Sequence, residues 1–252
     1  MIEELLDTPS SIWMVLLTIH EEHFDRSRGK KPMFLVLMLG SGIFWTATYL
    51  LIIRRSFLDH TYGMPMAALC ANISWECIFS FLYPPTIIQH VVNLVWFSLD
   101  VVIFIQLIRY GPREFADLSR RVFYGICGLT LITSFAAVLL TTIEFNDHGV
   151  YSAFAQNLMM SALFLAMLYR RRSLRGQSMS IAICKLLGTA FASLAFFLFS
   201  SLSHRSVLLP FLYIAILVYD IIYVGMVYRQ QRTATEKTQE SIIKPGQVEV
   251  SS

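Results

Sequence analysis

The sequence is poor in charged residues and in the residues that interrupt helices. Only 15% of its 252 residues are charged, 56% are hydrophobic, and the chain holds just 12 glycines and 8 prolines. A typical soluble domain carries about 25% charged residues, because its surface faces water. The shortage argues against a conventional soluble protein and indicates that lipid is the main solvent of this chain.

The chain also has few cysteines and a small net charge. The four cysteines, Cys70, Cys77, Cys127 and Cys184, show no spacing typical of metal or redox sites. Lys and Arg together exceed Asp and Glu by only three. The excess lies in short segments beside hydrophobic runs, which argues against a nucleic-acid partner. We therefore expect the cysteines to be packing residues and the partners to be membrane lipid and a small molecule.

Long hydrophobic runs are what the sequence has in abundance. A helix that spans a bilayer needs about 20 apolar residues. Windows of that length lie at about 33–53, 64–83, 86–108, 122–143, 149–169, 179–200 and 206–228. The runs are continuous, whereas a transmembrane strand alternates polar and apolar residues over about ten positions. The sequence therefore predicts an all-α, polytopic membrane protein whose seven transmembrane helices form a bundle.

The two ends of the chain differ from these runs. Ser11–Ile19 is apolar but too short to span, and the acidic residues before it are unlike a signal peptide. We expect residues 1–32 to form a lumenal segment with a short interfacial helix and residues 33–228 to form the membrane domain. Residues 229–252 are polar and lack aromatics, which predicts a disordered cytoplasmic tail.

The basic residues between the predicted spans favour one orientation. Twelve arginines lie on one side of the membrane: Arg54, Arg55, Arg109, Arg113, Arg120, Arg121, Arg170, Arg171, Arg172, Arg175, Arg229 and Arg232. The other side has five basic residues: Arg26, Arg28, Lys30, Lys31 and Arg205. The positive-inside rule then places the amino terminus in the lumen, which we expect to be that of the endoplasmic reticulum, and the carboxyl terminus in the cytoplasm.

Acidic residues inside the predicted spans are candidate functional groups, because an ionisable group in hydrocarbon costs several kcal/mol. Glu76 lies one helical turn after Asn72 in the second span. Asp100 ends a row with Asn93 and Trp96 whose spacings of three and four describe one face of the third span. Both acids are expected to face the interior of the bundle.

A third acid, Asp220, lies in the last span beside Tyr219, with Tyr213 and Tyr223 on its own face. At about 1.5 Å per residue, Glu76 lies about 18 Å from the cytoplasmic end of its span and the two aspartates about 12 Å. The three acids could therefore line one cavity in the middle of the membrane. Desolvation disfavours a charged carboxyl, so such a depth suits a protonated one, which is a Brønsted acid.

Structural roles are the alternative for these polar residues, since polar side chains commonly join helices in membrane bundles. The alternative weighs most for Asp100. Asn157 and Ser161 in the fifth span, and Lys185 in the sixth, could line the same cavity or simply bond to one another.

Several motifs together resemble one known family. They are Asp59-His60-Thr61-Tyr62-Gly63-Met64-Pro65, the segment Cys70–Glu76, Gly176-Gln177-Ser178 followed by Lys185 and Gly188, and Asp220, with Gly42, Trp45 and Tyr49 in the first span. Over roughly residues 40–230 the chain resembles the integral-membrane terpene cyclases of fungal meroterpenoid and indole-diterpene biosynthesis. The Gly176 segment is more similar to the meroterpenoid branch.

The resemblance implies an activity and a site. Family members cyclise a polyprenyl chain that usually ends in an epoxide and is attached to an aromatic or polyketide-derived head, without a metal or another cofactor. Two acids are essential in the family, and by motif they correspond to Glu76 and Asp220. We expect Glu76 to protonate the terminal epoxide or alkene and Asp220 to assist, and we expect Asp100 and Asn72 beside them.

The remaining candidates are residues for the substrate cavity. The aromatic side chains of Trp75, Trp96, Tyr213, Tyr219 and Tyr223 could stabilise a carbocation through their π faces, at about 2 kcal/mol per desolvated contact. Asn157 completes this set. The sequence lacks the Asp-Asp-x-x-Asp cluster of magnesium-dependent cyclases and the Asp-x-Asp-Asp motif of soluble proton-initiated ones. Both absences favour proton-initiated chemistry without a metal.

Three other classes compete with a cyclase. A proton-coupled seven-helix transporter would use the same buried acids, but the two halves show no paired motif and the spans no Pro-Gly breaks. A retinal protein needs a lysine in its last helix, where Leu208–Tyr228 has none. A receptor or scaffold would tolerate carboxyl-to-amide changes, and no loop feature favours it.

Overall fold

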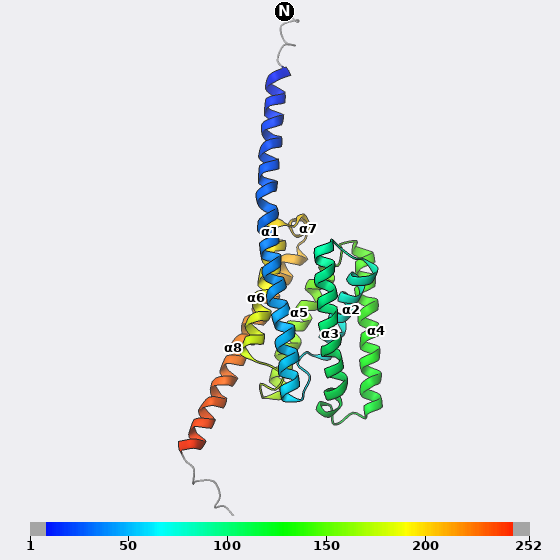
Figure 1. Ribbon diagram of the computed structural model, residues 1–252, viewed down its shortest axis with the longest axis vertical. Coiled ribbons are helices and arrows are strands. Elements are labelled where there is room, and N and C mark those ends of the chain that lie inside the picture. The colour runs from blue at the N-terminus through cyan, green and yellow to red at the C-terminus, as the bar shows by residue number, and fades with distance from the viewer. Residues whose placement is uncertain (1–8, 244–252) are drawn as a thin grey trace, which may run out of the picture.

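The structure is a computed structural model that describes the backbone of residues 9–243 and the side chains of residues 32–236 (Figure 1). Its described elements are all helical: α1 Pro9–Asp59, α2 Met66–Cys77, the π-helix η2 Ile78–Leu82, α3 Ile87–Glu114, α4 Arg120–Phe145, α5 Val150–Arg171, α6 Met179–Phe199, α7 Ser201–Arg205 and α8 Leu208–Ile243. The prediction of an all-α polytopic bundle is confirmed.

Six helices in this part of the chain are long and apolar enough to cross a membrane. They lie in α1, α3, α4, α5, α6 and α8 and coincide with six of the seven predicted spans. The other predicted span, 64–83, corresponds to the shorter apolar helix Met66–Leu82, which comprises α2 and η2. This segment is short because Pro65 precedes it and the pair Pro84-Pro85 follows it.

Local sequence signals set several of the helix ends. The side chains of Ser119 and Ser178 accept hydrogen bonds from backbone N–H groups three residues later, so they cap α4 and α6. Asn146 follows α4 in the left-handed conformation that asparagine tolerates well. Each cap lies outside the hydrophobic run that it borders, so the helices begin and end near the expected membrane surfaces.

The first and last described helices, α1 and α8, are long. Ser11–Ile19, for which an interfacial helix is expected, lies within α1, which continues unbroken into the first span. At the other end, α8 extends beyond residue 228 to Ile243. The rest of the expected disordered tail and residues 1–8 lie outside the described residues.

The helices form a closed ring rather than a simple row. The most extensive contact is between α1 and α6. α6 also packs against α8, and α8 packs against α5. α5 in turn contacts α2, α2 contacts α3, and α3 returns to α1. α4 packs on the outside of α2, as Figure 1 shows. The predicted second span is therefore flanked by three other helices, which explains why most of its side chains up to Ser80 are buried.

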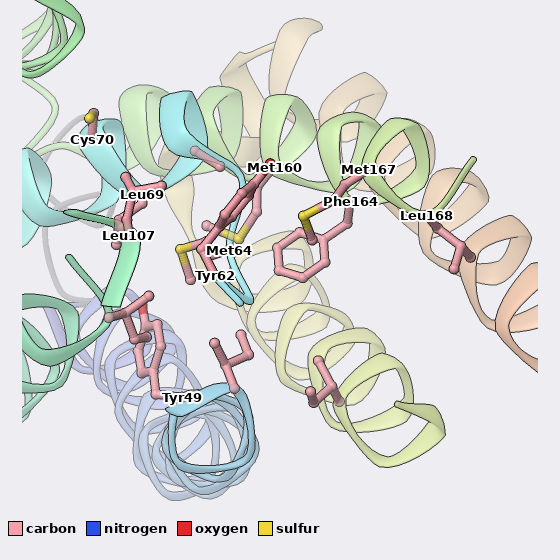
Figure 2. Packing of buried hydrophobic residues seen from close by; sticks show 14 of the residues in the cluster. Tyr49, Tyr62, Met64, Leu69, Cys70, Leu107, Met160, Phe164, Met167 and Leu168 are labelled. Atoms are coloured by element: carbon pink, nitrogen blue, oxygen red, sulfur yellow. The ribbon is translucent and has the colours of Figure 1, made fainter. Parts of the chain in front are cut away.

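The main hydrophobic core lies where α1, α2, α3 and α5 meet (Figure 2). Tyr49 of α1, Leu69 of α2, Leu107 of α3 and Phe164 of α5 are at most 2% exposed. Met160 fills the space between them, and methionine adapts well to irregular gaps. This core fixes the relative positions of the helices that carry the candidate acids.

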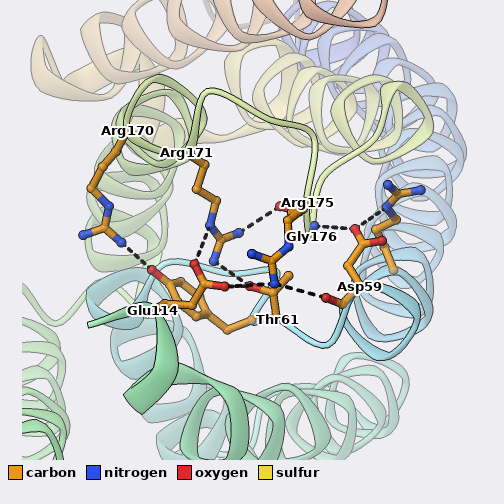
Figure 3. A network of polar contacts seen from close by, with 9 residues as sticks. Asp59, Thr61, Glu114, Arg170, Arg171, Arg175 and Gly176 are labelled. Carbon is orange, nitrogen blue, oxygen red and sulfur yellow. Dashed lines mark hydrogen bonds and ion pairs between the residues drawn. The ribbon is translucent and has the colours of Figure 1, made fainter. Parts of the chain in front are cut away.

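A second stabilising feature, which we call the polar clasp, joins the loops at one end of the bundle (Figure 3). Asp59 at the end of α1 accepts a hydrogen bond from the Gly176 backbone N–H at 2.7 Å and pairs with Arg55 at 2.6 Å. Gly176 has a φ of +71°, a conformation that favours glycine. The α1–α2 and α5–α6 connections are thereby held together.

Glu114, at the end of α3, completes the clasp. Its carboxylate accepts a hydrogen bond from the Thr61 hydroxyl at 2.8 Å and forms ion pairs with Arg171 at 3.7 Å and Arg175 at 3.3 Å. The Arg171 guanidinium also stacks 4.2 Å from the centre of the Tyr62 ring. Asp59, Thr61 and Tyr62 of the first motif and Gly176 of the later one therefore belong to the polar clasp.

Candidate active site

The first candidate acid, Glu76, lies in a buried polar group that we call the Glu76 cluster, made of Tyr49, Asn72, Glu76, Asp100 and Gln156. These residues come from α1, α2, α3 and α5, which the hydrophobic core holds together. All but Gln156, which is partly exposed, are at most 6% exposed. The structure thus brings together three predicted site residues, Glu76, Asp100 and Asn72, as the helical spacing indicates.

Asn72 organises this cluster. Its side-chain nitrogen donates hydrogen bonds to the Tyr49 hydroxyl and to Asp100 Oδ2, each at 2.6 Å. Its side-chain oxygen accepts a longer hydrogen bond of 3.5 Å from Gln156 Nε2. One amide therefore connects three helices, and each of its polar atoms has a partner.

Glu76 and Asp100 keep unused acceptors. Glu76 Oε2 and Asp100 Oδ1 are buried without a hydrogen-bond partner, and so is Gln156 Oε1. No Lys, Arg or His among residues 32–236 lies within ion-pair distance of either acid. Unpaired buried oxygens require an explanation, and a proton donor that arrives with a ligand or a water is the usual one.

The π-helix η2 begins two residues after Glu76 and changes the hydrogen bonding of that turn. The Tyr83 N–H donates to the Ile78 carbonyl, five residues earlier. Side chains of α3 bond to carbonyls in this segment, with His90 Nε2 2.9 Å from the Ser80 oxygen and Asn93 Nδ2 3.4 Å from the Phe79 oxygen. Single π-helical turns often occur at functional sites, which is consistent with a role for Glu76.

Asp220 lies in a different arrangement, the Asp220 cluster, which consists of Ser161, Lys185 and Asp220. The Lys185 ammonium donates to Asp220 Oδ1 and to the Ser161 hydroxyl, each at 2.6 Å. Both charged side chains are at most 1% exposed. The ring centres of Trp45 and Phe164 lie about 6 Å from the same ammonium. Ser161 and Lys185 thus bond to one another, one of the two roles that the sequence leaves open.

Residues of α5 link the two clusters. Gln156 belongs to the Glu76 cluster, and the next residue, Asn157, donates a 3.0 Å hydrogen bond to the Thr189 hydroxyl of α6. Asn157 Oδ1 and Asp220 Oδ2 are buried without partners, like the free oxygens of the first cluster. The unpaired acceptors therefore extend from α2 across α5 toward α8.

The predicted aromatic residues have different environments. Trp96 donates from its indole nitrogen to the Thr46 hydroxyl at 3.0 Å and lies edge-on to Tyr49, beside the Glu76 cluster. Trp75 donates to the Gly149 carbonyl at 3.0 Å and stacks near Phe79, so it ties α2 to the start of α5.

The three predicted tyrosines of α8 also have different environments. Tyr213 is hydrogen-bonded to the Ser203 hydroxyl at 2.7 Å, and Tyr223 donates to Gln177 Oε1 at 2.9 Å. Tyr219 is 38% exposed, whereas Asp220 beside it in the sequence is only 1% exposed. Tyr213 and Tyr223 therefore lie within the bundle, whereas Tyr219 lies on its surface.

Sequence reasoning did not assign site roles to Tyr49, Gln156 or Thr189, which complete the hydrogen-bond networks. Each is an ordinary residue in an apolar helix, and only its partner identifies it. Lys185 gave a clearer signal, because a lysine in a hydrophobic span is uncommon. No three His, Cys, Asp or Glu side chains between residues 32 and 236 are grouped as metal ligands.

Comparisons with known proteins identify the family to which the chain is similar. A family model for Pyr4-like transmembrane terpene cyclases matches residues 21–234. The Pyr4-family terpene cyclase mfmH of Annulohypoxylon moriforme is 32% identical over 167 residues, which cover 64% of this chain and 68% of the relative. Terpene cyclase penB of Penicillium crustosum is 31% identical over 176 residues, covering 66% and 72%. Terpene cyclase macJ of Penicillium terrestre is 29% identical over 166 residues, covering 62% and 64%. No solved structure matches the chain.

Proposed function

Because the chain belongs to the family of Pyr4-like transmembrane terpene cyclases, we propose that it protonates the terminal epoxide or alkene of a prenylated aromatic or polyketide-derived substrate. The protonated chain then undergoes cationic polyene cyclisation, as a step of meroterpenoid biosynthesis. The observation that carries the proposal is the buried Glu76 carboxyl, whose Oε2 has no hydrogen-bond partner and which has no cation nearby among the side chains of residues 32–236.

Glu76 is the proposed proton donor. A general acid must lie within about 3 Å of the atom that it protonates, and Glu76 Oε2 is free to take such a position. The proton moves to the epoxide oxygen as the bond from this oxygen to the tertiary carbon breaks. The neighbouring alkene then attacks that carbon, and further ring closures follow until a proton is lost, so the overall reaction is an isomerisation.

The surroundings of Glu76 support the donor role. The Asn72 side-chain nitrogen donates to both the Asp100 carboxyl and the Tyr49 hydroxyl. Asp100 and Glu76 lie on α3 and α2, so both acids are carried by helices rather than by loops. Asp100 is close enough to Glu76 for the two carboxyls to interact electrostatically. Two neighbouring carboxyls cannot easily both be ionised, which favours one shared proton.

Asp220 has a different proposed role because it already has a cationic partner. Its Oδ1 is ion-paired with Lys185, and only Oδ2 remains free. We assign to this oxygen an assisting role, in which it accepts a hydrogen bond from the substrate or the proton released after the last ring closure. Trp96 and Tyr49 present aromatic surface near the proposed donor, where each could stabilise positive charge by about 2 kcal/mol.

The proposal makes no use of a cofactor, and it places the chain in the endoplasmic reticulum membrane with its amino terminus in the lumen. The excess of arginine on one side of the bundle supports this orientation. The substrate is expected to be hydrophobic enough to dissolve in the bilayer, and no nucleic-acid partner is involved.

The test is to express the chain in a host without related pathways and to supply its microsomes with epoxyfarnesyl phenolic acid esters. Wild type, Glu76→Gln and Asp220→Asn are compared by mass spectrometry and NMR of the products. Glu144→Gln is the matched control, because Glu144 is an exposed carboxyl at the end of α4. We expect cyclised isomers from wild type and the control, and none from Glu76→Gln at equal yields of folded protein. Full activity of Glu76→Gln would refute the donor assignment.

A further inference from the structure

A groove runs between α6 and α8 on the side of the bundle away from the Glu76 cluster. It has a volume of about 280 Å³ and is lined by α6 from Leu186 to Phe197 and by α8 from Pro210 to Asp220. The lining positions of each helix recur every three or four residues, so each helix contributes one face. At about 1.5 Å per residue the groove is about 16 Å long.

The groove is open to the lipid. Leu194 and Phe197 on α6 and Ile214 and Leu217 on α8 line it and are 42–64% exposed. In a membrane protein such exposed apolar side chains face the hydrocarbon of the bilayer. A hydrophobic molecule dissolved in the membrane can therefore reach the groove sideways, without passing through water.

Polar atoms without partners are found in this otherwise apolar groove. Asp220 Oδ2 and Ser193 Oγ line it and have no hydrogen-bond partner, and the Asp220 residue is only 1% exposed. The hydroxyl of Thr189, also in the lining, is already an acceptor for Asn157. An occupant made only of hydrocarbon would leave two buried polar groups unpaired, at a cost of about 1–3 kcal/mol each.

The shape and the polar atoms together indicate the class of ligand. The groove is long for its volume of about 280 Å³, which lies just below the range of about 300–1,000 Å³ for small-molecule sites, so it suits an extended chain better than a fused ring system. Its ligand must be apolar over most of its length and must carry oxygen at one place. An acyl chain of a membrane lipid meets the first condition but not the second.

We propose that this groove is a bilayer-facing entry site for the substrate, which holds an isoprenoid chain along Ala190, Leu194 and Leu217. An oxygen of the substrate accepts a hydrogen bond from the Ser193 hydroxyl, and a hydroxyl group of the substrate donates one to Asp220 Oδ2. The inference rests on the proposed function for the identity of the ligand. It adds a binding site on α6 and α8, in which Thr189 is hydrogen-bonded to Asn157 of α5, the residue next in sequence to Gln156 of the Glu76 cluster.

The test uses a prenylated phenol with a terminal epoxide and a diazirine in its chain, applied to the full-length protein in microsomes. After irradiation, peptide mapping locates the label. We expect labelling of α6 and α8 residues of the groove, and competition by the unlabelled epoxide. Ala190→Phe, which fills the groove, is expected to reduce this labelling at least tenfold. Ile183→Phe is the matched control, because Ile183 lies on the lipid-facing surface of α6 outside the groove.

Ser193→Ala tests the polar end without adding volume. It is expected to weaken competition by the epoxide three- to tenfold, while competition by the same chain without oxygen is unchanged. Equal labelling of wild type and Ala190→Phe overturns the proposal, and so does labelling by a diazirine fatty acid that the epoxide does not displace. Wild type that is labelled in the groove but forms no cyclised product contradicts the proposed function alone. Wild type that cyclises the substrate but is labelled elsewhere contradicts the entry site alone.

Discussion

Replacing Lys185 by methionine should be the most destabilising single change in the membrane domain. The Lys185 ammonium is fully buried, lies 2.6 Å from Asp220 Oδ1 and also donates to Ser161 at 2.6 Å. Methionine has a similar length but no charge, so Lys185→Met leaves the Asp220 carboxylate and the Ser161 hydroxyl without their partner.

The size of the effect follows from the geometry. At 2.6 Å and an effective dielectric constant of about 20, the attraction between the two charges is about 6 kcal/mol. The desolvation of both groups offsets much of this attraction. Removal of one partner from a buried pair typically costs about 3–5 kcal/mol, because the other charge remains buried and unpaired. We therefore expect Lys185→Met to lose about 3–5 kcal/mol of unfolding free energy.

The assay is an SDS titration of the purified protein in mixed micelles, followed by the fraction that remains folded. The double variant Lys185→Met with Asp220→Leu is the informative comparison, because it removes both charges together. Replacement of both partners of a buried pair by apolar residues is often neutral or stabilising. We expect the double variant to recover most of the stability lost in the single one while forming little product.

Two results would refute this reasoning. A Lys185→Met variant within about 1 kcal/mol of wild type would mean that the ion pair contributes little to the fold. A double variant no more stable than the single one would mean that the loss comes from packing around the lysine side chain, whose ammonium lies about 6 Å from the ring centres of Trp45 and Phe164, rather than from the unpaired carboxylate.

Three further expectations concern the Glu76 cluster, the polar clasp and the orientation. Asn72→Leu removes the amide that holds Asp100 and Tyr49 beside Glu76, and the microsomal assay should show a fall of about a hundredfold in product, since such misplacement can cost that much; an unchanged rate would rule out a positioning role. Gly63→Ala places a methyl group against the Ser56 hydroxyl, and the SDS titration should show a loss of about 1–3 kcal/mol, whereas Gly42→Ala, with open space around it, should show none. A tag on the carboxyl terminus should be digested by protease in sealed microsomes and a tag on the amino terminus protected; the reverse pattern would contradict the lumenal amino terminus.

The membrane helices could be predicted from the sequence because each is signalled by its own residues. A continuous apolar run of about 20 residues has few alternatives to a helix in lipid, where every backbone group must be satisfied within the segment. The second span was harder to define, since Met66–Leu82 is short and ends in a π-helix. Its membership of the bundle depends on burial between α3, α4 and α5, which only the tertiary structure shows.

The candidate site was predictable only in part. Helical spacing correctly indicates that Asn72 and Glu76 share a face, and the structure adds Asp100 from α3 to the same cluster. The idea of one cavity that contains all three acids rested on depth in the membrane alone. Depth does not specify the angular position around the bundle or the partners of an acid, and the structure pairs Asp220 with Lys185 of α6, so one cavity shared by all three acids stays a prediction.

The motif that carries the family resemblance also divides into two kinds of residue. In the polar clasp, the Gly176 N–H donates to Asp59 and the Thr61 hydroxyl donates to Glu114, and neither bond involves one of the three candidate acids. Their type is required by local geometry, such as the positive φ of Gly176, rather than by chemistry on a substrate. Sequence similarity weights both kinds equally, so only the contacts distinguish a structural motif residue from a catalytic candidate.

The same distinction applies to the two acids themselves, which look alike in sequence because each follows an aromatic residue in an apolar span. Among the described side chains no cation lies within ion-pair distance of Glu76, whereas Asp220 is paired with Lys185 of α6. Glu76→Gln therefore removes the proposed proton donor without leaving a described charge unpaired. Asp220→Asn leaves a buried ammonium without its counter-charge, so loss of activity there follows from instability as readily as from chemistry. The double variant that combines Lys185→Met with Asp220→Asn would separate the two effects. If it folds as well as wild type but forms no product, the Asp220 carboxylate or its lysine contributes directly to catalysis.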